Sequence, residues 1–232
     1  EICACLVGSE MCIRDRFKND QQDIQHRYYS FDFCYFHFRS SKESGTIDIE
    51  KSCQVLWSYL ASWGMLRGSS FLLWKNPAYL KDLVEWIYEQ PLSSWDIDVD
   101  DYKESSQTVL DLYNAAEKCM LKGKNHQAVT LVTKVLLGVF AIIPAYDRFF
   151  RDSFSDIAGN KCGFNTLNKK SLEIIYQFYI ENKEEIEKLS NETKVFDFNG
   201  LPTKYHYSKA KIIDMYGFQV GYMKLGKESQ FR

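Results

Sequence analysis

The chain has 232 residues, of which 45% are hydrophobic and 16% aromatic, and this is ample for a sizeable core. Only four prolines and 12 glycines argue against a disordered or collagen-like chain. The formal net charge of −2 gives no overall footprint for nucleic acid, although it is compatible with a local basic patch. The longest uncharged apolar run, residues 135–145, is shorter than the roughly 20 residues of a membrane helix, so we expect no membrane partner.

Cysteine and histidine usage argues against a disulfide framework and against a metal site. The seven cysteines are odd in number, irregularly spaced and without a Cys-x-x-Cys pair. The four histidines do not cluster with cysteines or carboxylates at ligand spacing. We therefore expect a cytoplasmic protein with free thiols, no metal and no cofactor.

The N-terminal end looks foreign to the rest of the chain. Residues 6–16 resemble a translated sequencing-adapter sequence, so we expect residues 1–16 to be non-native. The alternative is a genuine N-terminal segment with a short apolar stretch. We expect residues 17–29 to form a loose polar lead-in, residues 30–225 a single helical domain, and residues 226–232 a C-terminal tail.

Hydrophobic spacing predicts helices over most of the chain. The clearest covers residues 48–63, where apolar side chains recur at spacings of four, three, four and three. The predicted helices are 31–40, 48–63, 78–89, 102–121, 125–143, 145–156, 168–189 and 209–223. The alternating aromatics of the first also allow a strand, and residues 195–198 allow a short extended piece. Ser30, Asn125 and Ser208 are predicted N-caps.

One stretch is apolar on all sides and therefore belongs in the middle of the protein. Between residues 127 and 146 its only charged residue is Lys134. A buried lysine needs a partner, and Asp147, just past Pro144, is the nearest candidate. We therefore predict an all-α fold, a single globular domain of about seven or eight helices around a buried central helix, about residues 125–143.

Polar side chains at the end of this stretch form the first candidate site. Asp147 could serve as a base or an anion tuned by Lys134, with Arg148 beside it. The alternative is a buried Lys134–Asp147 pair that fixes how two helices meet.

The second candidate follows a tryptophan-bearing helix, where Arg67, Ser69 and Ser70 flank Gly68. Backbone amides, hydroxyls and a guanidinium suit a phosphate or carboxylate at the next helix N-terminus. The alternative is a helix–helix turn in which the serines only cap the following residues.

The last predicted helix carries two further features. Asp214 and Gln219 are polar positions, which we interpret as a polar rim. Gly217 and Gly221 lie four residues apart on one face, where another helix can approach closely. No phosphate-binding loop, nucleophile elbow or His-Glu-x-x-His motif is present.

Several segments resemble one family of bacterial all-helical proteins. They are YLASWGMLRGSSFLL (59–73), TKVLLG (133–138), PAYDRF (144–149) and IDMY (213–216), and the similarity spans roughly residues 30–222. The resemblance implies a bacterial intracellular protein. It brings no particular activity, and no functional residue is carried over.

A second resemblance covers only residues 133–136 and 144–147, which look like the segment of helix-hairpin-helix DNA glycosylases that ends in their catalytic aspartate. It implies that Asp147 stabilises positive charge at an anomeric carbon. The chain departs from that pattern, because it has no glycine-flanked hairpin just upstream, no lysine nucleophile in the expected place and no basic excess to hold DNA.

Two functions therefore stand side by side. The first is a soluble helical binding or regulatory protein with a polar pocket near Arg67 and Asp147, which predicts that Lys134 and Asp147 satisfy one another. The second is an enzyme acting on nucleic acid or nucleotide, with Asp147 catalytic in an open, basic-rimmed cleft. The predicted ligand-binding residues are Arg67, Ser69, Ser70, Lys134, Tyr146, Asp147 and Arg148.

Overall fold

The computed structural model describes residues 23–68, 70–159 and 161–229, with the side chains of the last five of these left out. The predictions for residues 1–16, for residues 17–22 of the lead-in and for the end of the tail lie outside the described residues. The described part contains nine α-helices and one two-stranded sheet, which confirms the all-α class. It has one helix more than the eight predicted segments because residues 168–189 form two helices that meet at Asn182.

The α-helices are α2 (Tyr29–Ser44), α3 (Ile49–Ser62), α4 (Lys81–Glu89), α5 (Tyr102–Leu121), α6 (Val129–Phe140), α7 (Arg148–Ile157), α8 (Lys169–Glu181), α9 (Lys183–Glu192) and α10 (Lys209–Ser229). Short 3-10 helices are η1 (Phe71–Trp74), η2 (Pro77–Leu80), η3 (Leu92–Trp95) and η4 (Val99–Asp101). The strands β1 (Lys194–Phe196) and β2 (Pro202–His206) pair antiparallel, and β2 was not predicted. None of the described helices is both long and apolar enough to cross a bilayer.

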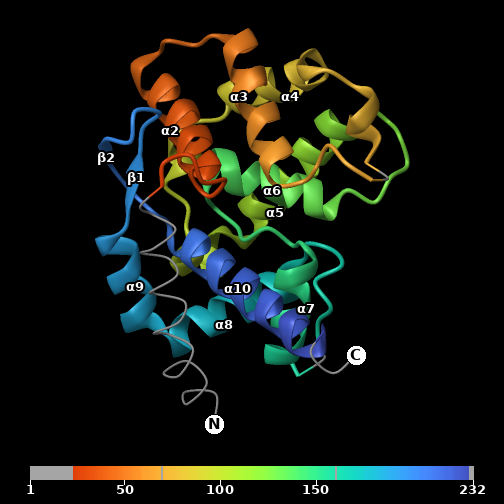
Figure 1. The fold of residues 1–232 in the computed structure, drawn as a ribbon, viewed down its shortest axis with the longest axis vertical. Helices are drawn as coiled ribbons and strands as arrows, with labels where there is room; N and C mark the ends of the chain where they lie inside the picture. The colour runs from red at the N-terminus through yellow and green to blue at the C-terminus, as the bar shows by residue number, and fades with distance from the viewer. Residues whose placement is uncertain (1–22, 69, 160, 230–232) are drawn as a thin grey trace.

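Helix α6 lies in the middle of the molecule, in contact with α2, α3 and α5 (Figure 1). Every residue from Leu131 to Phe140 is buried, which confirms the predicted central helix. Helices α7 to α10 occupy the lower part of the view, and the hairpin lies at its left edge beside α2.

Several predicted helix ends were wrong. Helix α6 begins after Ala128 rather than at Asn125, and it stops at Phe140 because Ala141 takes a left-handed conformation with φ +58°. Helix α2 starts before Ser30, so this serine is not an N-cap, and it continues to Ser44, where Gly45 closes it with φ +70°. The predicted cap of the last helix is confirmed, because Ser208 Oγ accepts a hydrogen bond from Lys211 N at 3.0 Å.

The segment after α6, residues 141–147, is irregular although its first six residues are fully buried. Buried backbone groups outside regular structure must find other partners. Side chains from three helices and a loop supply them: Ser208 and Tyr102 donate to carbonyls, Asp214 and Thr133 accept from amides, and Thr130 donates to the carbonyl of Tyr146. The segment is therefore held in one conformation by the helices around it.

Helix α10 packs closely on α7, as its glycines predicted. A Cβ placed on Gly221 would overlap the backbone of Phe149, and one on Gly217 would lie 2.5 Å from a ring carbon of Phe150. This close approach brings the middle of α10 against the start of α7, where Asp147 lies.

Candidate functional site

Lys134 and Asp147 form the predicted ion pair, with Nζ and Oδ2 3.0 Å apart. The lysine side chain is 5% exposed and the aspartate side chain 16%. The second carboxylate oxygen, Oδ1, accepts a hydrogen bond from Phe150 N at 3.1 Å, so Asp147 is also the N-cap of α7. Because both oxygens are engaged, the pair fixes α6 to the start of α7.

A second buried pair lies nearby, between Lys211 and Asp214 on α10, at 3.0 Å. Asp214 Oδ1 also accepts a hydrogen bond from Ala145 N at 3.0 Å. The interpretation of Asp214 and Gln219 as a polar rim was wrong, because both residues are only 8% exposed. The face of α10 that carries Asp214 is covered by the irregular segment, whose backbone needs a polar partner there.

Trp63, the C-cap of α3, lies between the two pairs. The Nζ atoms of Lys134 and Lys211 lie 5.1 and 5.6 Å from its ring centroid, within the range of cation–π contact. The exposed guanidinium of Arg27 lies 5.3 Å from the same ring. We call these residues, together with Asp147 and Asp214, the Trp63 site.

The indole N–H of Trp63 is buried and finds no hydrogen-bond acceptor among the described residues. Buried donors are nearly always paired, so an unpaired one needs an explanation. The ring itself is only partly buried. The indole N–H is therefore a buried donor for which the described residues supply no acceptor, in a ring that also stacks on Tyr28 with centroids 5.7 Å apart.

The Trp63 site carries more positive than negative charge. Three cations, Arg27, Lys134 and Lys211, face one ring, and the site holds two carboxylates. Arg27 lies outermost of the three, since it is exposed and both lysines are buried. The site therefore favours an anionic group at its outer side.

Asp32, at the start of α2, adds a titratable group behind the site. Burial raises the pKa of this carboxyl to about 7, although hydrogen bonds from Tyr207 Oη at 2.6 Å and Phe196 N at 2.9 Å, and the charge of Lys211, oppose the rise. Asp32 thereby ties the hairpin to α2.

The predicted Arg67 turn adjoins the Trp63 site. Gly64, with φ +75°, follows Trp63 directly, and the Arg67 side chain folds against it, within 2.7 Å of where a Cβ would stand. Ser70 Oγ accepts a hydrogen bond from Leu72 N at 3.3 Å and caps η1, which agrees with the turn alternative. Ser69 lies outside the described residues. The structure thus places the Arg67 side chain against Gly64, the residue that follows Trp63.

Two predicted residues lie apart from the Trp63 site. Tyr146 is fully buried, and its hydroxyl points to α8, where it bonds Ser171 Oγ at 3.0 Å. Arg148 is exposed and pairs with Asp152 at 3.6 Å along α7. Tyr146 is therefore part of the core, and Arg148 belongs to a neighbouring surface.

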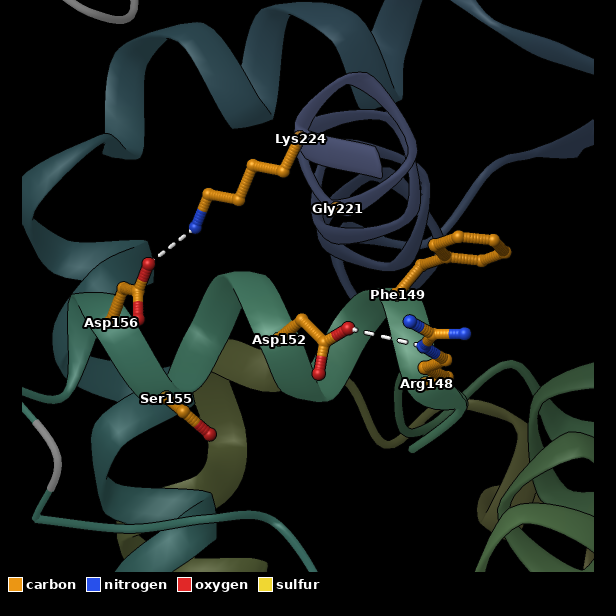
Figure 2. A pocket seen from close by; sticks show the side chains of 7 residues that line it. All are labelled: Arg148, Phe149, Asp152, Ser155, Asp156, Gly221 and Lys224. Atoms are coloured by element: carbon orange, nitrogen blue, oxygen red, sulfur yellow. Dashed lines mark hydrogen bonds and ion pairs between the residues drawn. The ribbon is translucent and has the colours of Figure 1, made fainter. Parts of the chain in front are cut away.

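That surface is a groove of about 410 Å³ between α7 and α10, in which Arg148 and Asp152 lie at one end and Lys224 and Asp156 at the other (Figure 2). Its lining consists of Arg148, Phe149, Asp152, Ser155, Asp156, Gly221 and Lys224. Phe149 packs edge-on against Phe218, which packs against Trp63, with ring centroids 5.0 and 5.9 Å apart. An aromatic wall therefore connects the groove to the Trp63 site.

The four cysteines among the described residues are free thiols. The described part of the chain contains no group of three or more His, Cys, Asp or Glu side chains placed to hold a metal ion. Sequence reasoning missed Trp63, Arg27 and Lys211. The one available signal was a second lysine within an apolar run, Lys211 next to Ile212 and Ile213.

No family model matches the sequence, and no curated protein or solved structure is significantly similar to it. The resemblances to a bacterial family and to a segment of DNA glycosylases therefore stay predictions. The function of the Trp63 site is inferred from its geometry.

Proposed function

We propose that the protein is a helical binding or regulatory protein whose ligand lies over Trp63, between the Arg67 turn and the Lys134–Asp147 pair. The observation that carries this is the buried, unpaired indole N–H in a ring that three cations face. The ligand class is an anion with a flat or apolar body, such as a nucleotide or a sugar phosphate. The charged group would meet Arg27, and the body would lie on the ring.

The alternative, an enzyme that acts on nucleic acid or nucleotide with Asp147 catalytic, fits the geometry less well. A catalytic carboxylate needs an oxygen within reach of the substrate. Both oxygens of Asp147 are engaged, by Lys134 and by Phe150 N. This arrangement favours a binding role for the site.

We also propose a bacterial cytoplasmic setting. The free thiols of the described cysteines suit a reducing compartment, and the resemblance to a bacterial family points the same way.

The proposal is tested by a thermal-shift and tryptophan-fluorescence series with nucleotides and sugar phosphates, on wild type and two variants. Trp63→Phe keeps an aromatic ring but removes the N–H, and Arg27→Gln removes the outermost cation. We expect a ligand shift in the wild type and a roughly tenfold weaker affinity in either variant, the size of one lost hydrogen bond to a charged group.

Trp86→Phe is the matched control, since it removes an indole that packs against Phe140, outside the site, and should leave the affinity unchanged. Arg148→Gln reports whether the groove in Figure 2 belongs to the same site. Equal shifts in the wild type, Trp63→Phe and Arg27→Gln, or no shift in any protein, would rule out a ligand over Trp63.

A further inference from the structure

The most exposed tryptophan whose position is described lies away from the Trp63 site, on η1. Trp74 is 83% exposed and its neighbour Leu73 is 47% exposed. Large apolar side chains that stay exposed to water often mark the sites at which a protein binds a partner. We therefore ask which kind of partner would cover the Trp74 ring.

Three lysines surround the ring of Tyr79, which lies on η2, the next 3-10 helix along the chain. The Nζ atoms of Lys122, Lys75 and Lys124 lie 4.7, 5.6 and 5.9 Å from its centroid. One carboxylate, Asp82, pairs with Lys122 at 2.8 Å. The cations therefore exceed the acids that the structure pairs with them, which makes a local basic patch on a chain with net charge −2.

Flat side chains lie among these cations. The Phe71 ring stacks on His126 with centroids 5.3 Å apart and planes 10° apart, and it meets Tyr79 at 5.9 Å. His126 is exposed, at the loop that joins α5 to α6. We call the set Phe71, Trp74, Lys75, Tyr79, Lys122, Lys124 and His126 the Trp74 face.

We propose that the Trp74 face binds single-stranded nucleic acid. Exposed aromatic rings provide stacking surfaces for unpaired bases, and cations beside them follow the phosphates. Lysine is depleted in protein–protein interfaces, which makes a protein partner a poorer fit. Trp74 is 83% exposed, so an unpaired base can reach its ring from solvent.

The test measures fluorescence polarisation of the full chain with a labelled oligothymidylate of about 20 nucleotides. With three lysines on phosphates, the logarithmic salt slope should be about −2, so affinity should fall roughly 20-fold between about 50 and 200 mM salt. Trp74→Ala should weaken binding about tenfold at the lower salt, the effect of losing one stacked base. The double variant Lys122→Gln/Lys124→Gln should flatten the salt slope to about −0.7.

The chain offers matched controls. Phe198→Ala removes an equally exposed aromatic, at 80%, from the hairpin connection, and Lys169→Gln/Lys170→Gln neutralises two exposed lysines on α8. Both should bind like the wild type.

Absence of binding at the lower salt, or equal losses in Trp74→Ala and Phe198→Ala, would overturn the proposal. So would Trp74-dependent sedimentation with phosphatidylglycerol vesicles without oligonucleotide binding, since that outcome assigns the face to a lipid surface. Failure of the Trp63 ligand series leaves this test intact, because the two use different variants.

Discussion

The Trp63 site and the Trp74 face both combine a tryptophan with three cations, but the cations are stabilised in different ways. At the Trp63 site two lysines are buried, and each is paired with a carboxylate that also accepts a backbone hydrogen bond. At the Trp74 face the lysines lie around an exposed surface, and among the described residues the close carboxylate is Asp82, which pairs with Lys122. Buried charges need fixed partners, whereas exposed charges are stabilised by water and stay available to a ligand.

The largest expected effect is on stability at the buried pair. Asp147→Asn keeps a residue that can cap α7 but leaves Lys134 without its counterion, so we expect a loss of about 3 kcal/mol in the free energy of unfolding. Urea denaturation measures it. The double variant Lys134→Met/Asp147→Asn should recover part of the loss, because it removes the unpaired charge. A single variant as stable as the wild type would mean that the pair is not buried as described.

An intermediate effect is expected from pH at Asp32. Its folded pKa, about 7, lies above the ordinary value of 3.8, so the folded state holds the proton more tightly than the unfolded state does. The resulting stabilisation is complete below about pH 4 and is lost as pH rises through 7. The wild type should therefore lose stability relative to Asp32→Asn between pH 5 and pH 8, by at most about 1.4 kcal/mol per pH unit. Parallel pH profiles of the two proteins would contradict this.

The smallest effect is expected where the charges are exposed. Arg148 and Asp152 pair at 3.6 Å with side chains 68% and 53% exposed. Asp152→Asn should change the free energy of unfolding by less than about 1 kcal/mol, and less still at high salt. A loss as large as that of Asp147→Asn would erase the contrast between buried and exposed pairs.

The fold class and the central helix could be predicted from the sequence because both depend on local hydrophobic spacing. The all-apolar run around Lys134 requires a buried helix, and a buried lysine requires an acid close in sequence, which is Asp147. The break at Ala141 could not be predicted, because a left-handed alanine is stabilised by tertiary contacts rather than by its own preference.

The Trp63 site was hidden for the same reason. Arg27 precedes α2 and Trp63 follows α3, so two helices separate them in the sequence. Lys211 belongs to α10, near the other end of the chain. Asp214 looked like an exposed position since nothing local shows that Ala145, 69 residues earlier, needs an acceptor. Such pairings follow from packing and not from periodicity.

The irregular segment at 141–147 has a consequence for how the chain is made. Its amide at Ala145 and its carbonyl at Ala141 are satisfied by Asp214 and Ser208, which the ribosome adds last among its partners. Until α10 has emerged, the centre of the protein therefore contains peptide groups without their final partners. Contacts over such long sequence separations slow folding. The nascent chain should accordingly reach its protease-resistant state only when α10 docks.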